Sequence, residues 1–237
     1  MFFGLDPVWI LITLGGLGLG LLAQGRVKSA FHRYSQVGVR SQMTGAQAAR
    51  AVCRAAGVEG VTIEEHQGFL SDHYDPRHKA LRLSPEVYNG RSVSSIAVAA
   101  HEAGHAIQHA RAYRWLGFRS AMVPMVQIGS QIWVLPFIIG ALLGGAASAG
   151  IGGPLMMVGV ALFALTVLFQ LVTLPVEFDA SNRAKAVLAH TGIVSTAEEA
   201  QGVSKVLGAA ALTYVAAAVT GVVQLIYLLS IVMGNRD

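Results

Sequence analysis

Two histidines and a glutamate lie close together in V-A-A-H-E-A-G-H-A-I-Q-H-A, residues 98–110. His101, Glu102 and His105 form the pattern H-E-x-x-H, which is a zinc signature when it lies on a helix. Residues four apart share one face of a helix, so the two imidazoles can bind one metal ion. Glu102 is then placed to act as a general base on an attacking water. The pattern therefore predicts metal-assisted hydrolysis.

The surrounding sequence predicts a helix over residues 93–110. This stretch lacks proline and is rich in alanine, and serines at its start are candidate N-caps (Ser92, Ser94, Ser95). The alternative is that the two histidines are half-buried polar residues that only pack. A glutamate beside two histidines on an apolar helix is costly to bury without a partner, so we favour the metal site.

The composition predicts a membrane protein. The 237 residues are 54% hydrophobic and 13% charged, and the mean hydropathy is +0.55. A single cysteine, Cys53, allows no intramolecular disulfide and no thiolate zinc site, so His and carboxylate side chains must hold the metal. The net charge of +4 fits the positive-inside bias of membrane proteins. No basic run with interleaved aromatic residues indicates nucleic acid, so no nucleic-acid partner is expected.

Four apolar stretches are long enough to cross a bilayer core of about 30 Å. They cover residues 7–24, 121–147, 154–175 and 209–233. A signal peptide is the alternative for the first stretch, but Asp6 precedes it and basic residues follow, which favours a retained anchor. Pro124 and Pro136 would kink the second stretch. The glycine-rich link at 148–153 predicts a tight hairpin between the second and third.

Two polar segments, residues 25–120 and 176–208, carry 16 of the 17 Lys and Arg residues. The positive-inside rule assigns both to the cytoplasmic face of the cell (inner) membrane. The first segment predicts a helix over 44–56, a strand over 58–66 and a strand pair over 72–84. Together the segments predict a small α+β catalytic domain at the membrane surface.

Two histidines leave a catalytic zinc one protein ligand short. Glu177 is the better candidate because it follows the third span, on the same predicted side as His101 and His105. The alternative is that Glu177 only favours a helix N-terminus electrostatically. His109 lies about 12 Å of helix rise beyond His101, so we expect it on the polar face or behind the ligands.

The ligand set predicts one Zn²⁺ per chain, with Glu102 as the general base. A further donor is expected to stabilise the oxyanion or bind substrate. Four residues are candidates, and the sequence does not rank them: Tyr74, His73, Arg183 and His190.

These residues resemble a known family, the bacterial membrane zinc metallopeptidases of the YugP type. The likeness covers nearly the whole chain. It runs through S-D-H-Y-D-P at 71–76, L-R-L-S at 81–84, V-A-A-H-E-A-G-H-A-I-Q-H at 98–109, T-L-P-V-E-F at 173–178 and A-A-A-L-T-Y-V-A-A-A at 209–218. A looser likeness to HtpX-like and CAAX-prenyl membrane proteases rests on H-E-x-x-H and a distal E-F-x-A-D pattern. The Glu of that pattern is a zinc ligand, which supports Glu177.

The resemblance implies a gluzincin-like core, in which a strand beside the active helix pairs with extended substrate. We expect that strand within residues 71–83. The chain departs from the looser pattern at Ser181, where those families have an Asp that orients a zinc-bound His. Asp179, two residues away on another helical face, is the candidate carboxylate behind the ligands.

The sequence thus predicts a mostly α membrane protein with about four transmembrane helices and a small gluzincin-like α+β domain. We expect a zinc metalloendopeptidase that cleaves membrane-associated or misfolded polypeptides. Two alternatives stay open: a non-catalytic protein with a structural or sensory zinc site, and a zinc hydrolase of a non-peptide bond. The sequence does not indicate an oligomeric state.

Overall fold

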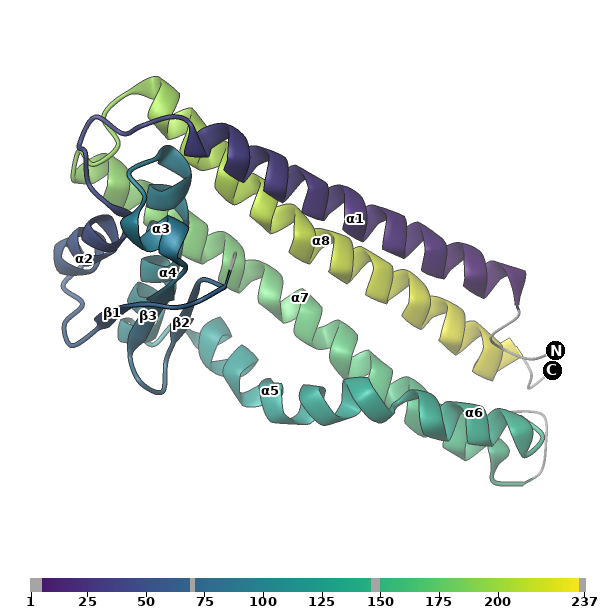
Figure 1. Ribbon diagram of the computed structural model, residues 1–237. Helices are drawn as coiled ribbons and strands as arrows, with labels where there is room; N and C mark the ends of the chain where they lie inside the picture. The colour runs from purple at the N-terminus through teal and green to yellow at the C-terminus, as the bar shows by residue number, and fades with distance from the viewer. Residues whose placement is uncertain (1–5, 69–70, 146–149, 235–237) are drawn as a thin grey trace. The chain divides into compact units, whose positions relative to one another are not determined.

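The computed structural model describes residues 6–68, 71–145 and 150–234, and these are mostly helical (Figure 1). The chain forms two compact units. The polar unit comprises Ala23–Gly117 and Pro175–Thr213, and the apolar unit comprises Met1–Leu22, Phe118–Leu174 and Tyr214–Asp237. In chain order the elements are α1 (Pro7–Ser35), α2 (Gly45–Ala55), β1 (Thr62–Glu65), β2 (His73–Asp75), β3 (Ala80–Leu83), α3 (Pro85–Asn89), α4 (Val93–Ala110), α5 (Arg114–Ile132), α6 (Val134–Leu142), α7 (Gly152–His190) and α8 (Ala197–Gly234).

Four helical stretches in the described residues are long and apolar enough to cross a membrane. They are α1, the pair α5 and α6, α7 and α8. The prediction of a mostly helical protein with four apolar spans is therefore confirmed. The predicted link at 148–153 and the end of the second span fall partly on residues 146–149, outside the described part of the chain.

Three helices are longer than the sequence predicted, and the first of them, α1, continues to Ser35 beyond the span predicted over residues 7–24. The third span and the polar segment after it form the single helix α7, which continues through Pro175. Prolines are tolerated inside membrane helices, because neighbouring groups satisfy the backbone that they free. The predicted short helix and the fourth span likewise form one helix, α8. Pro136 follows the break between α5 and α6, whereas Pro124 lies inside α5.

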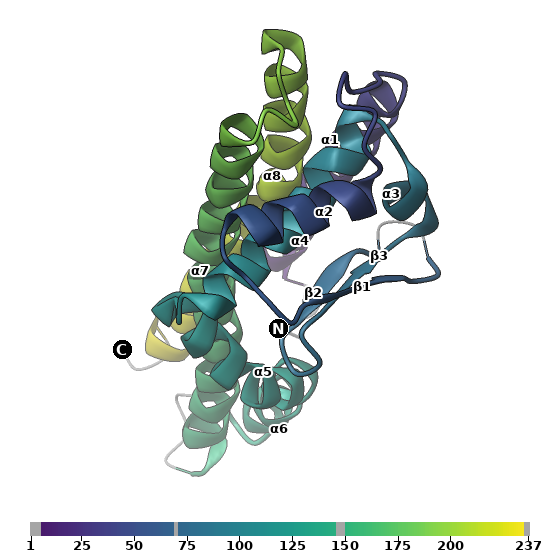
Figure 2. The same cartoon turned by 90° about the vertical axis from the view of Figure 1, so that its left-hand side faces the viewer.

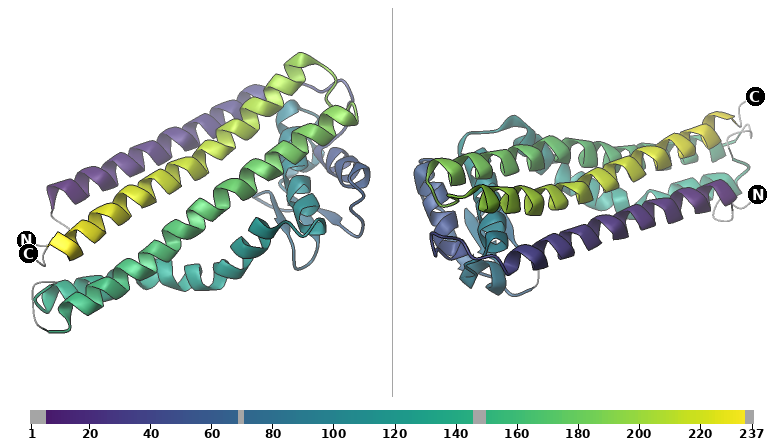
Figure 3. Two further views of the ribbon diagram at one scale, coloured as in Figure 1. Left: turned by 180° about the vertical axis from the view of Figure 1, so that it is seen from behind. Right: turned by 90° about the horizontal axis from the view of Figure 1, so that it is seen from above.

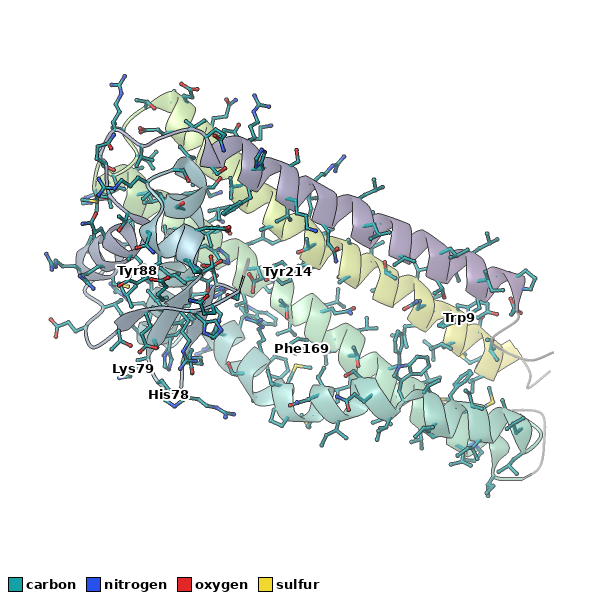
Figure 4. The ribbon with its side chains drawn as sticks, viewed as in Figure 1. Trp9, His78, Lys79, Tyr88, Phe169 and Tyr214 are labelled. Atoms are coloured by element: carbon teal, nitrogen blue, oxygen red, sulfur yellow. The ribbon has the colours of Figure 1, made fainter. Side chains whose placement is uncertain are left out.

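The apolar unit packs around the buried side chain of Phe137. Its neighbours are apolar residues of α7 and α8 (Met156, Val160, Phe163, Val167, Leu228, Val232). α1 and α8 lie side by side in this unit (Figure 3), and Trp9 of α1 stacks on Tyr227 of α8 with ring centroids 5.7 Å apart. Figure 4 labels Trp9 at this end of α1.

The polar unit is built around α4, which is buried along most of its length. α2 packs on α4 (Figure 2) and begins at a capping box, in which Thr44 and Gln47 satisfy each other's backbone N–H groups. The three-stranded sheet has the order β1-β3-β2, with β1 parallel and β2 antiparallel to β3. Leu81 and Leu83 of β3 are fully buried in the same core as α4.

α4 and α7 touch backbone to backbone at Gly104. A Cβ at this position would collide with the carbonyl oxygen of Ala180 and would lie 3.0 Å from its carbonyl carbon. A glycine here allows a contact between helices that no other residue permits. The contact brings residues 101–108 of α4 next to residues 176–181 of α7.

We predict that Gly104→Ala destabilises the protein by about 1–3 kcal/mol, because the added methyl group must push α4 and α7 apart. Thermal unfolding in detergent would show this as a lower midpoint. The matched control is Gly208→Ala in α8, where nothing lies within 4 Å of the added Cβ. That control should be neutral or stabilising, since alanine favours a helix by about 1 kcal/mol over glycine.

Candidate metal centre

α4 holds the two histidines of the H-E-x-x-H pattern on one face. The helix begins at Ser92, whose side chain accepts a hydrogen bond from the backbone N–H of Ser95. This cap satisfies a free donor at the helix start and fixes where the first turn begins. His101 and His105 then lie one turn apart, with ring centroids separated by 4.8 Å.

Glu177 of α7 reaches both imidazoles with one carboxylate oxygen. Its Oε2 lies 3.2 Å from His101 Nε2 and 3.6 Å from His105 Nε2. All three side chains are largely buried, with exposures of 14%, 10% and 4% for His101, His105 and Glu177. Among the described residues, this is the one group of His, Cys, Asp and Glu side chains close enough to share a metal ion.

The distances from the Glu177 carboxylate to the two imidazoles fit a tetrahedral zinc site. Two donor atoms bound to one zinc at about 2.1 Å lie about 3.4 Å apart at the tetrahedral angle. The distances of 3.2 and 3.6 Å from the carboxylate to the two imidazoles bracket that value. Two imidazoles and one carboxylate are also a donor set that zinc accepts in catalytic sites, where a fourth position stays open.

The other ring nitrogen of each histidine has its own partner. His101 Nδ1 lies 3.1 Å from Ser181 Oγ, and His105 Nδ1 lies 3.0 Å from Gln108 Oε1. Hydrogen bonds on this side of an imidazole orient the ring and fix which nitrogen faces the metal. Both rings therefore turn Nε2 towards Glu177.

Carboxylates make the site electrostatically negative. Burial alone would lower the pKa of His105, but Glu177 and Glu102 outweigh it and raise that pKa. Glu102 is itself buried on α4, with 8% exposure. Its charge also contributes to a raised pKa of Asp72, for which burial is the main cause and which hydrogen bonds from Ser84 oppose. A cation bound here would offset this concentration of negative charge.

Tyr74 and His109 meet at the C-terminal end of α4. Tyr74 comes from β2 and His109 from the end of α4, and Tyr74 Oη lies 2.8 Å from His109 Nδ1. Burial, followed by the nearby Cys53 and Asp75, raises the pKa of Tyr74, so the phenol stays protonated at neutral pH. No strand among the described residues pairs with the outer edge of β2.

The remaining sequence-predicted residues have different surroundings. Asp179 accepts hydrogen bonds from Gln108 Nε2 at 2.8 Å and Arg183 Nε at 2.6 Å. Arg183 also lies over the ring of Tyr113, and its side chain is 30% exposed. His73 Nδ1 lies 2.8 Å from the Ser71 carbonyl oxygen.

His190 does not join the cluster. It is exposed at the end of α7, 13 residues or about 20 Å of helix rise beyond Glu177. The structure thus separates His190 from the three candidate ligands, and its role as a substrate-binding or transition-state residue stays a prediction.

Two residues near the site were not identified from the sequence. They are Gln108 and Asp72, to which the sequence patterns assign no role. The available signal for Gln108 was its position three residues after His105 on a mostly apolar helix, which places both on one face. Asp72 offered no such signal, because its partners Ser84 and Glu102 lie far away in sequence.

The fold and this donor set define a zinc metallopeptidase family, and the chain belongs to it. The family described as "Putative neutral zinc metallopeptidase" matches residues 9–233. The chain is similar to the Bacillus subtilis (strain 168) protein named "Putative membrane protease YugP", with 44% identity over 230 residues. That alignment covers 97% of this chain and 99% of the relative. No solved structure matches the chain.

We predict that Glu177→Ala abolishes stoichiometric zinc binding by the purified protein. Loss of a residue that supports a ligand typically weakens zinc binding by about 10–100-fold, and loss of a ligand should exceed this. Elemental analysis and competition with a chromogenic chelator would measure the change. Glu198→Ala, which removes an exposed carboxylate at the start of α8, is the control and should bind zinc as the parent does. Full zinc occupancy of the Glu177 variant would rule out this ligand.

Proposed function

We propose that the protein is a membrane zinc metalloendopeptidase with a gluzincin-like core. The observation that carries this proposal is the convergence of three donor atoms from His101, His105 and Glu177, which all lie within 4.8 Å of one another. Glu102 adjoins the first ligand in sequence, as a general base for an attacking water requires. Membership of the zinc metallopeptidase family supports the same chemistry.

In the proposed mechanism, His101, His105 and Glu177 would hold a Zn²⁺ ion. The ion would supply Lewis acidity and lower the pKa of a water to about 7. Glu102 accepts the proton of the attacking water and delivers it to the departing amine. Tyr74 donates its phenolic hydrogen to the developing oxyanion, and His109 holds the phenol in place.

The free edge of β2 is the proposed docking site for the substrate backbone. An extended peptide can pair with an unpaired strand edge through main-chain hydrogen bonds. Hydrogen bonds hold both ends of β2. Ser84 donates to Asp72, which precedes the strand, and Arg82 donates to Asp75, the last residue of the strand. Figure 4 shows His78 and Lys79 at the tip of this hairpin.

The substrates that we propose are membrane-associated or misfolded polypeptides on the cytoplasmic side. The concentration of Lys and Arg in residues 25–120 and 176–208 supports that side. Glu177 also follows Leu174, the end of the apolar stretch of α7, by only three residues of a continuous helix. This is about 5 Å of helix rise, which favours substrates that lie close to a lipid surface.

We predict that Glu102→Gln retains one zinc per chain and loses proteolysis, since the amide cannot take a proton from water. Both proteins would be purified in detergent, analysed for zinc and assayed with casein and for self-cleavage. Glu198→Gln is the matched control and should keep both properties. Equal activity of the parent and the Glu102 variant would exclude this mechanism. Zinc in both proteins without hydrolysis in either would instead support a structural or sensory metal.

We predict that Tyr74→Phe lowers kcat by roughly 10²-fold or more with zinc binding intact, because one oxyanion donor is removed. Steady-state kinetics on a peptide substrate would separate kcat from KM. Tyr88→Phe is the control, since Tyr88 is a partly buried tyrosine of α3 that packs on the same core (Figure 4). An unchanged kcat in the Tyr74 variant would remove this residue from the mechanism.

A further inference from the structure

Gln108 is the polar residue most deeply buried beside the candidate metal centre. Its side chain has 0% exposure in the core of the polar unit, although its amide has four hydrogen-bonding positions. A buried amide without partners would cost several kcal/mol. Nε2 donates to the Val176 carbonyl oxygen at 2.7 Å and to Asp179 Oδ2 at 2.8 Å, while Oε1 lies 3.0 Å from His105 Nδ1.

These partners determine the orientation of the amide. The Val176 carbonyl and the Asp179 carboxylate are both acceptors, so the nitrogen of the amide must face them. The opposite orientation would place the amide oxygen against two other oxygens and leave both without a donor. Gln108 Oε1 therefore faces His105, and because an amide oxygen only accepts, His105 Nδ1 must carry the hydrogen.

A proton on Nδ1 leaves the lone pair of neutral His105 on Nε2, the atom that faces Glu177. This is the form of the imidazole that binds a metal through Nε2. His101 has no equivalent constraint, since its Nδ1 faces the Ser181 hydroxyl, which can either donate or accept. Gln108 thus fixes the metal-binding tautomer of His105, in which Nδ1 carries the hydrogen, and no such constraint acts on His101.

The same amide also connects the two helices that supply the ligands. Gln108 belongs to α4, and the Val176 carbonyl belongs to the residue immediately before Glu177 on α7. Asp179 is held in turn by Arg183, whose Nε donates to the same carboxylate oxygen. A chain of hydrogen bonds therefore runs from Arg183 through Asp179 and Gln108 to His105.

From this network, and resting on the proposed function, we infer that Gln108 is a positioning residue. Its amide links Asp179 to His105 through hydrogen bonds and keeps Nε2 of that imidazole available for the metal. Its hydrogen bond to the Val176 carbonyl sets the distance between His105 and Glu177. The residue takes no part in bond making, so its contribution is to the affinity for zinc and to the geometry of the ligands.

The first test compares Gln108→Met with Ile107→Met in the full-length protein in detergent. Ile107 is the neighbouring residue of α4, buried in the same core but outside the network. Competition with a chelator should show zinc binding weakened by about 10–100-fold in Gln108→Met and by less than about two-fold in Ile107→Met. Thermal unfolding of the zinc-free proteins would show how much of the change comes from packing alone.

The second test exchanges the two polar groups. Gln108→Glu alone places two carboxylates together and should weaken zinc binding, because Asp179 and the Val176 carbonyl both lose the hydrogen bond that the Gln108 amide donates. Adding Asp179→Asn restores a donor opposite the new carboxylate, which still accepts from His105 Nδ1. The double variant should therefore bind zinc more tightly than Gln108→Glu or Gln108→Met, whereas a role in packing alone would give no recovery.

The outcomes separate the two proposals. If the parent binds no zinc, the proposed function fails. If the parent binds zinc and a folded Gln108→Met binds it equally tightly, the positioning role is overturned and the proposed function stands. If Gln108→Met loses zinc and the double variant does not recover it, the relay through Asp179 is overturned.

Discussion

The close contact of α4 and α7 at Gly104 and Ala180 is the constraint on which the candidate metal centre depends. One face of α7 meets α4, and it carries residue 176 together with the residues one, four and five positions later, which are 177, 180 and 181. On that face, Glu177 reaches both histidines, Ser181 reaches His101, and the backbone before Glu177 reaches Gln108. A wider separation of the helices would lengthen all of these contacts together.

Local sequence patterns predicted the elements that depend on local spacing. The helix over 93–110 and the shared face of His101 and His105 follow from a periodicity of 3.6 residues. The four apolar spans follow from length and hydropathy. The prediction of Glu177 as a ligand required more than local spacing. It rested on the order of the apolar spans along the chain and on a resemblance to known proteases.

Features that depend on tertiary contacts were harder to predict. The amide of Gln108 has its partners Val176 and Asp179 about 70 residues away in the chain, so no local pattern distinguishes it from a glutamine that faces solvent. β1 covers only Thr62–Glu65 of the predicted strand over 58–66, since pairing with β3 limits its length. Composition also does not reveal that α7 is continuous through Pro175.

The order of the ligands along the chain has a consequence for biogenesis. His101 and Glu177 are separated by 76 residues, and α5, α6 and the apolar part of α7 are synthesised between them. A chain still emerging from the ribosome has the H-E-x-x-H helix but lacks the carboxylate that completes the donor set. The three candidate ligands therefore come together only after the third apolar stretch has been made and α7 has packed on α4, so a shorter nascent chain lacks one of the donor side chains.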